Sequence, residues 1–395
     1  MAKATQEQFQ ARSSVLYTGF FLNGMAIVLT GALLPRLSQL NHMDDRQAGL
    51  LLATQSFGNF LGAFLVSNRP LRSLVLGTGF TFAGLLFAGF VAAGGSPLWT
   101  IYPGFLLFGF GLGATATATN LIVGARGPAV RARHLSAINF LWSVGAITSP
   151  ILIAVLITHL TVRSILLLFS LAFLLLLPAL LRRVSRPIDN NESTSATILP
   201  EPNPSAAVIY FAVLFFLYGG TEMSLSGWLA SYAQRFAGAT ATSNPLAPAA
   251  FWTGITAGRA AGSFFLHRIR ESHALMLSSS LCMIALVTLL LSSSTGMVLV
   301  LAGAAGFFLG PFFPATVSAA IGTGLPSRRL GPLLALCGLG ASTLPFLVGV
   351  TSAATASLRT GLMLPILYCA LMFITIALYR PRLTVGAPLP HNTLA

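Results

Sequence analysis

Apolar residues occur in long, nearly uninterrupted runs along the whole chain, and short polar stretches separate these runs. Twelve runs can be counted, at approximately 14–34, 47–67, 74–93, 98–122, 135–157, 164–181, 206–232, 246–266, 274–291, 297–321, 333–351 and 358–379. Most of them approach or exceed the roughly 20 helical residues that cross a bilayer core. They lack the alternation of membrane-spanning strands. The pattern therefore predicts an all-α integral membrane protein with 12 transmembrane helices.

The positions of the charged residues orient these helices. The chain is 55% hydrophobic, 8% charged and carries a formal net charge of +14. With a cytoplasmic N-terminus, sixteen of the 22 Lys and Arg residues fall in connections on the cytoplasmic side. Arg259 lies within the eighth run. Five fall on the other side, namely Arg36, Arg46, Arg163, Arg235 and Arg359. Because positive loops stay in the cytoplasm, we expect a multi-pass protein of the cell inner membrane with both termini cytoplasmic. The positive charge then needs no nucleic-acid partner.

The longest polar connection divides the chain into two halves. It joins the sixth and seventh runs and is rich in Pro, Asn, Ser and Thr, which is typical of a linker. We predict an N-terminal six-helix bundle over 1–183, a cytoplasmic linker over 184–205 and a C-terminal six-helix bundle over 206–395.

The two halves also share short sequence matches. GNFLGAF at 58–64 matches GRAAGSF at 258–264, an offset of 200 residues. VGAITSP at 144–150 matches LGASTLP at 339–345, an offset of 195, and GFGLG at 109–113 matches GFFLG at 306–310, an offset of 197. Three matches in the same order predict a duplication, with two six-helix pseudo-repeats. The glycines of the second and eighth runs are expected to allow close helix approach.

Two parallel six-helix halves joined by a cytoplasmic linker resemble the major facilitator fold, in which the substrate site lies between the halves near the bilayer midplane. Further stretches resemble the fucose–galactose–glucose symporter branch of that superfamily, including its sodium-dependent glucose transporter-like members. These are GALLP at 31–35, QAGLLLATQSFGNFLG at 47–62, GFGLGATATATN at 109–120, INFLWSVGA at 138–146, YGGTEMSLSGWLASY at 218–232, FWTGITAGR at 251–259 and LGPFFP at 309–314. The resemblance implies a secondary transporter that works as a monomer.

Two departures from the family pattern affect the expected mechanism. Fucose-type proton symporters carry acids in the first and fourth helices, where this chain has Asn23 and Asn120. The family loop signature after the second helix survives only as SNRPLR at 67–72, with Asn68 where an Asp is expected. The first departure argues against proton coupling through the N-terminal half. The second weakens the usual cytoplasmic contact, although Arg69 and Arg72 remain.

Glu222 is the one acid, among eight, that falls inside an apolar run. A carboxylate near the bilayer centre costs about 2.5–3.5 kcal/mol on insertion scales, so such groups are functional by default. Glu222 could bind the coupling H+ or Na+, or hydrogen-bond a substrate hydroxyl, or be a structural group paired with Arg259. Arg259 keeps its proton at any useful pH. It could neutralise Glu222, anchor an anionic substrate, or extend towards the cytoplasmic interface.

Polar amides in the N-terminal half are the remaining candidates for substrate binding. Such side chains either join helices, at about 0.6 kcal/mol each, or donate to and accept from sugar hydroxyls. The candidates are Asn23, Gln55, Asn120 and Asn139.

Aromatic residues complete the candidate substrate site. Trp142 lies close to Asn139 along the fifth run, and Tyr218 shares a helical face with Glu222, four residues away. We therefore include Trp142 and Tyr218 with Glu222 in the predicted substrate site. Three further aromatics near the outer ends of their runs are expected to be interfacial anchors, namely Trp228, Tyr232 and Trp252.

These features favour a secondary active transporter that moves a small polar solute, a sugar by preference, by cation-coupled symport with alternating access. The alternative is a proton-coupled exporter of drug-like or amphipathic compounds, since GAITSP at 145–150 loosely matches an antiporter signature. A membrane receptor or scaffold is a third class. An enzyme is not indicated, because there is no Walker A sequence, no catalytic set and no metal-ligand spacing. No cofactor is expected beyond the coupling H+ or Na+.

Overall fold

The computed structural model describes residues 2–66, 69–92, 94–125, 128–184, 205–265, 269–323 and 327–379. Within these ranges the regular structure is helical. The first half contains α1 (Ala2–Ile27), α2 (Leu29–Leu40), α3 (Asp45–Phe64), α4 (Pro70–Val91), the short 3₁₀ helix η1 (Leu98–Thr100), α5 (Ile101–Gly124), α6 (Pro128–Leu156) and α7 (Val162–Val184). The second contains α8 (Ser205–Phe236), α9 (Leu246–Phe265), α10 (Glu271–Leu291), α11 (Thr295–Leu309), α12 (Phe312–Gly322), α13 (Ser327–Thr355), α14 (Leu358–Gly361) and α15 (Met363–Leu378).

Each of the twelve predicted runs corresponds to one helix or to one interrupted helix. In the described part of the chain, ten helical segments of 21 to 31 residues are long and apolar enough to cross a membrane. The helices α3 and α9, each 20 residues long, supply the other two spans. Three spans are interrupted helices, because α1 continues into α2, α11 into α12 and α14 into α15. The prediction of 12 transmembrane helices is therefore confirmed.

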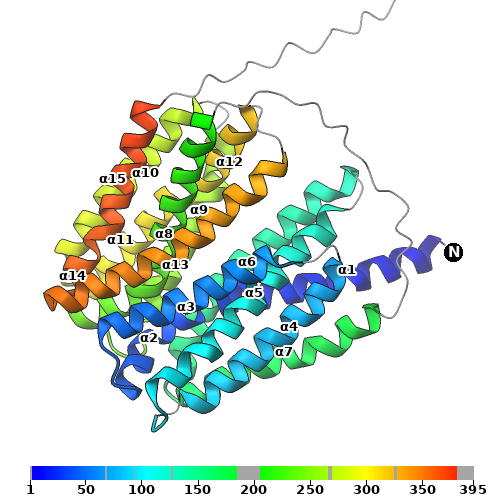
Figure 1. Cartoon of the computed structure of the whole chain (residues 1–395), viewed down its shortest axis with the longest axis horizontal. Coiled ribbons are helices and arrows are strands. Elements are labelled where there is room, and N and C mark those ends of the chain that lie inside the picture. The colour runs from blue at the N-terminus through cyan, green and yellow to red at the C-terminus, as the bar shows by residue number, and fades with distance from the viewer. Residues whose placement is uncertain are drawn as a thin grey trace, which may run out of the picture.

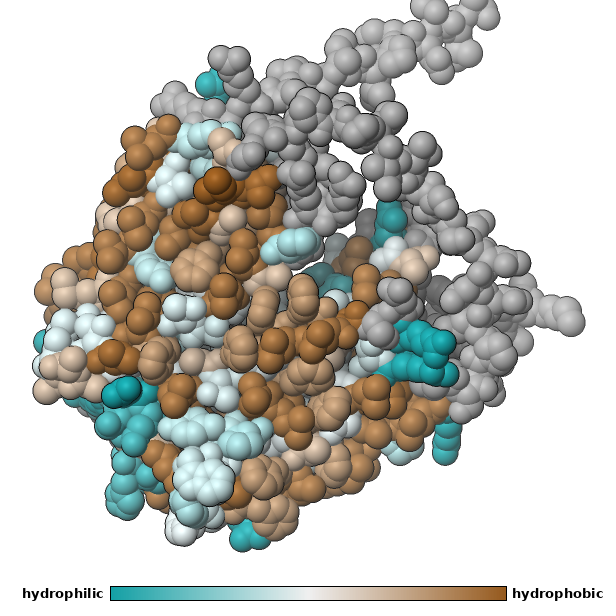
Figure 2. Space-filling view, in the orientation of Figure 1, coloured by the Kyte–Doolittle hydropathy of each residue, from teal (hydrophilic) through white to brown (hydrophobic). Residues whose placement is uncertain are grey.

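Many large apolar side chains remain exposed on the sides of the helices. Leu175, Leu291 and Leu378 are 70%, 80% and 83% exposed. Brown apolar residues cover much of the visible face, whereas teal hydrophilic residues gather mainly near its edges (Figure 2). A soluble protein rarely exposes apolar surface on this scale, so the sides of this molecule are suited to lipid.

The helices form two groups that lie side by side, α1–α7 (blue to green) and α8–α15 (green to red) (Figure 1). The groups contact each other where α3 packs on α13, α6 on α9 and α2 on α8. We call the end that holds the α2–α3 connection and the C-terminal end of α8 the tight end. The opposite end, where α7 stops at Val184 and α8 begins at Ser205, is the linker end.

Glycine contacts reveal how the two halves repeat. Between α3 and α5, a Cβ added at Gly62 would lie 1.9 Å from the carbonyl oxygen of Phe110. Between α9 and α11, a Cβ added at Gly258 would lie 2.0 Å from the carbonyl oxygen of Phe307. The counterpart of Gly62 is therefore Gly258, an offset of 196. The predicted match of Gly58 with Gly258 at offset 200 is wrong by one helical turn.

A second pair of helices repeats at the offset of 195 that the sequence predicts. A Cβ at Gly24 in α1 would lie 2.0 Å from the carbonyl oxygen of Trp142 in α6. A Cβ at Gly219 in α8 would lie 2.1 Å from the carbonyl oxygen of Cys337 in α13. This register makes Tyr218 the counterpart of Asn23, so equivalent positions in the halves carry different chemistry.

We expect Gly340→Ala to destabilise the protein, because a Cβ there would lie 1.9 Å from the carbonyl oxygen of Phe216 in α8. Overpacking of this kind costs about 1–3 kcal/mol. Gly79→Ala is the matched control, since a Cβ at Gly79 would meet nothing within 4 Å. Thermal unfolding in detergent measures both variants. Equal midpoints for the two would contradict the close contact of α8 with α13.

Candidate functional site

Glu222 and Arg259 form an ion pair between α8 and α9. Arg259 Nη2 donates to Glu222 Oε1 over 3.0 Å. Tyr218 Oη donates to the same carboxylate oxygen over 2.6 Å and accepts from Arg259 Nη2 over 3.2 Å. The pairing that the sequence left open is thus present. Three polar side chains form one closed network in the middle of the membrane-spanning region.

The network contains one negative and one positive charge, and both charged side chains remain partly exposed. The side chains of Glu222 and Arg259 are 13% and 30% exposed. One carboxylate oxygen receives both donors, and Arg259 Nε has no hydrogen-bond partner among the described residues. A single-oxygen contact lacks the second bond of a bidentate Arg–carboxylate pair. The carboxylate can therefore accept a proton or a cation while Tyr218 and Arg259 remain beside it.

The ring of Tyr218 is packed inside the C-terminal half. It stacks on Phe312 of α12 with ring centroids 5.8 Å apart and planes 5° apart, and it contacts Phe313 at 5.5 Å. Tyr218 is 1% exposed. Its ring faces are covered by these phenylalanines, and its hydroxyl contacts Glu222 and Arg259. Both phenylalanines lie in the LGPFFP stretch at 309–314, but the sequence did not indicate that they would pack on Tyr218.

The two buried amides, Asn23 and Gln55, join helices within the N-terminal half. Asn23 donates to the carbonyl oxygen of Leu112 over 3.1 Å and to the hydroxyl of Thr115. Gln55 donates over 3.1 Å to the carbonyl oxygen of Ile27, where α1 ends and the interrupted first span begins again. Both amides are 2% exposed. Their donors are therefore used for helix packing in this conformation.

The other two candidate amides donate along their own helices. Asn120 donates to the carbonyl oxygen of Ala116 over 3.0 Å, and Asn139 to that of Leu135 over 2.8 Å. Asn120 is half-buried, whereas Asn139 is exposed. These bonds use the side-chain NH₂ groups, so each side-chain carbonyl oxygen can still accept a hydrogen bond from a hydroxyl group. Their place in a substrate site stays a prediction.

Trp142 meets an aromatic partner from the other half. Its ring lies edge to face with that of Trp252, with centroids 5.1 Å apart and an interplanar angle of 76°. Trp252 Nε1 donates to Ser226 Oγ over 2.9 Å. Ser226 lies one turn from Glu222 along α8, on the side of the tight end. The Trp142–Trp252 contact therefore joins the two halves near the ion pair.

The prediction of interfacial anchors is wrong for Trp228, Tyr232 and Trp252. All three are fully buried. Trp228 donates to the carbonyl oxygen of Pro345 over 3.0 Å, and Tyr232 to that of Leu289 over 3.0 Å. Their polar atoms are satisfied inside the bundle rather than at a membrane–water interface. Their position near the ends of the runs gave no sign of these neighbours.

Two predicted features lie outside the described residues. Ser67 and Asn68 of the loop signature are among them, as is the linker between 185 and 204. The division of the chain at 183 and 206 stays a prediction.

The sequence profile of the Major Facilitator Superfamily matches residues 16–331, and the chain belongs to that superfamily. It is a multi-pass membrane transporter rather than an enzyme. The glucose/galactose transporter of Brucella abortus is 26% identical over 384 residues, which are 90% of each chain. Bypass of stop codon protein 6 of Saccharomyces cerevisiae is 31% identical over 158 residues, which are 36% of this chain and only 32% of that protein.

Solved structures share the same fold. The D-xylose-proton symporter superimposes with a TM-score of 0.75 at 12% identity, covering 93% of this chain and 96% of that one. The transporter FucP in its outward conformation superimposes with a TM-score of 0.59 at 18% identity, covering 93% and 98%.

Proposed function

We propose that this protein takes up a neutral sugar by symport with H+ or Na+. The observation that carries the proposal is the Glu222–Arg259–Tyr218 network, which places an accessible carboxylate among membrane-spanning helices. An intramembrane acid with a named partner is typical of ion pathways. The relative named glucose/galactose transporter and the fold shared with a xylose-proton symporter support a sugar as the substrate.

The proposed substrate site lies between the halves, beside the ion pair. Trp142 offers an aromatic surface to the sugar ring, and the hydroxyl groups meet Glu222 together with the amides of the N-terminal half. The charged pair has no counterpart in that half, because Ile27 and Ala63 occupy the positions equivalent to Glu222 and Arg259. Cation coupling then belongs to the C-terminal half, and in the N-terminal half the side-chain oxygens of Asn120 and Asn139 are left for hydroxyl recognition.

In the proposed orientation the protein lies in the cell inner membrane, and its linker end faces the cytoplasm. The distribution of sixteen Lys and Arg residues against five supports it, with both termini inside. The carrier then works as a monomer of two six-helix bundles, 1–183 and 206–395, joined by the cytoplasmic linker 184–205. No nucleic acid takes part.

We expect wild-type protein in proteoliposomes to accumulate labelled glucose, galactose or fucose under an inward gradient of H+ or Na+. Each sugar is tested with each gradient separately, and liposomes without protein give the background. Competition by unlabelled sugars identifies the preferred substrate. If no sugar accumulates or competes under either gradient, the symport proposal fails, and export of amphipathic compounds becomes the leading account.

A further inference from the structure

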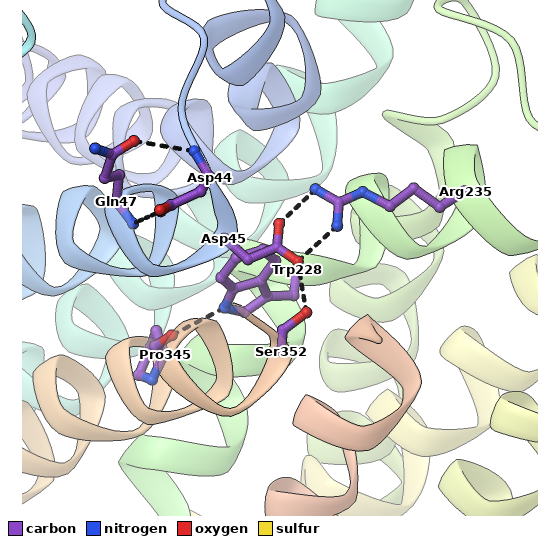
Figure 3. A network of polar contacts seen from close by, with 7 residues as sticks. All are labelled: Asp44, Asp45, Gln47, Trp228, Arg235, Pro345 and Ser352. Atoms are coloured by element: carbon purple, nitrogen blue, oxygen red, sulfur yellow. Dashed lines mark hydrogen bonds and ion pairs between the residues drawn. The ribbon is translucent and has the colours of Figure 1, made fainter. Parts of the chain in front are cut away.

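At the tight end, one carboxylate of the N-terminal half is held by two side chains of the C-terminal half. Arg235, in the last turn of α8, donates Nη2 to Asp45 Oδ1 over 2.6 Å and Nη1 to Asp45 Oδ2 over 2.7 Å. Ser352 of α13 donates its hydroxyl to Asp45 Oδ2. Asp45 begins α3. The three residues converge from three helices (Figure 3).

The geometry of this contact separates it from an ordinary surface ion pair. Exposed pairs contribute little unless the arginine binds both carboxylate oxygens, as Arg235 does here. The side chain of Asp45 is 13% exposed and that of Arg235 is 38% exposed. The pair is therefore partly shielded from water and salt, and opening the tight end would leave both charges without their partner.

Each side of the contact is fixed by its own half. In the N-terminal half, Asp44 and Gln47 exchange bonds of 2.7 and 3.0 Å that cap α3 and so position Asp45. In the C-terminal half, the bond from Trp228 to Pro345 ties α8 to α13, the two helices that carry the partners of Asp45 (Figure 3). The contact thus joins two preorganised surfaces.

The backbones beneath the contact are also close. A Cβ added at Gly349 in α13 would lie 2.3 Å from the carbonyl oxygen of Asp45 and 2.9 Å from the Cα of Gly49. A Cβ added at Gly31 in α2 would lie 2.4 Å from the carbonyl oxygen of Ser226. Separating the halves at this end must therefore break the ion pair and the backbone contacts together.

We propose that Asp45, Arg235 and Ser352 form an inter-half latch that holds the tight end closed and is broken each time the carrier opens there. The proposal rests on the proposed function for its place in the transport cycle, in which the halves rock about a site between them. The latch lies away from the Glu222–Arg259 pair, so it controls access rather than binding the sugar.

A cysteine pair across the halves can report closure of the tight end. A Cβ at Gly227 in α8 would lie 3.5 Å from Leu52 Cγ and 2.6 Å from Leu52 Cδ1 in α3. Replacing Leu52 with cysteine removes those atoms and leaves room for a second sulfur. The reporter is Leu52→Cys with Gly227→Cys. Cys337 is only partly buried and is replaced by alanine, whereas Cys282 and Cys369 are fully buried and are kept.

We expect the reporter to form an inter-half disulfide readily in the full-length chain under mild oxidation. A protease site inserted between 185 and 204 lets the crosslinked halves be separated from the free halves on a gel. Asp45→Asn and Arg235→Gln should each slow crosslinking by about tenfold, the equivalent of about 1.4 kcal/mol. Asp44→Asn is the matched control, because Asn also caps a helix and Asp44 does not bridge the halves.

A charge reversal separates the latch from general damage. Asp45→Arg and Arg235→Asp, made singly, bring like charges together and should slow crosslinking more than the neutral variants. The double variant restores opposite charges, so it should crosslink faster than either reversal alone. Recovery is expected to be partial, because an arginine at the first residue of α3 opposes the helix dipole and loses the Ser352 bond.

Two results would overturn the latch. One is a crosslinking rate for Asp45→Asn equal to that of Asp44→Asn. The other is a double reversal that crosslinks no faster than the faster of the two single reversals. The readout needs no substrate, so it does not depend on the sugar. If uptake fails for every sugar while crosslinking still responds to the charge reversal, the sugar proposal falls and the latch stands.

Discussion

Glu222→Gln is expected to abolish gradient-driven accumulation while leaving sugar exchange intact. The amide keeps the shape of the side chain and can still accept from Tyr218 and Arg259, but it can neither take up a proton nor hold a cation. A membrane potential of 100 mV supplies about 2.3 kcal/mol per charge, which supports about 50-fold accumulation with one coupled cation. The variant should reach an accumulation ratio near one. Uptake and counterflow in proteoliposomes measure the two activities.

The control for this substitution is Glu271→Gln. Glu271 lies at the linker end, where it begins α10 and accepts from Ser318 over 2.7 Å. It carries the same chemistry outside the membrane-spanning core, so its replacement should leave accumulation unchanged. If Glu222→Gln still accumulates sugar as the wild type does, coupling does not pass through Glu222.

The helices could be predicted from the sequence because lipid imposes a simple requirement on every span. Each must be long, apolar and internally hydrogen-bonded, and hydropathy alone records this. The interruption within the first span was not predicted. The first span breaks at Val28, where Gln55 from another helix binds the freed carbonyl oxygen of Ile27. Because the hydrogen bond from Gln55 is a tertiary contact, no local sequence pattern predicts this interruption.

The error in the repeat register has a specific physical origin. Close helix packing places glycines four residues apart, as at Gly58 and Gly62, and α9 carries three such glycines at 254, 258 and 262. A two-glycine motif can be matched to three glycines in two ways, one turn apart. The backbone contacts distinguish the two, because Gly62 meets Phe110 as Gly258 meets Phe307.

Scarcity of charge made part of the site predictable. Glu222 and Arg259 stand out because ionisable residues are rare within apolar runs, and their pairing follows from adjacent helices. The latch had no such signal. Asp45 and Arg235 are 190 residues apart in the chain, and both fall in polar connections where charges are ordinary. Their contact depends on how the two halves meet, which hydropathy does not encode.

The ion pair also explains why removing its cation should be more harmful than removing the whole pair. Taking away one partner of a buried pair leaves an uncompensated charge and costs about 3–5 kcal/mol, whereas replacing both partners is often close to neutral. Among the described residues, Tyr218 would remain the one side-chain donor to Glu222 if Arg259 were lost. A single neutral hydroxyl cannot balance a carboxylate among membrane-spanning helices.

We therefore expect Arg259→Gln to lower the free energy of unfolding in detergent by about 3–5 kcal/mol, the cost of removing one partner of a buried pair. We also expect it to lower sugar exchange. The double variant Glu222→Gln/Arg259→Gln should recover most of the stability and the exchange, but not accumulation, because the coupling carboxylate is gone. Arg359→Gln is the control, because it removes an arginine that packs on another helix, 4.7 Å from the ring centroid of Phe236, without removing a partner of Glu222. If the double variant is as unstable as the sum of the two single variants, Glu222 and Arg259 do not act as a pair, and the charge-compensation argument for this site fails.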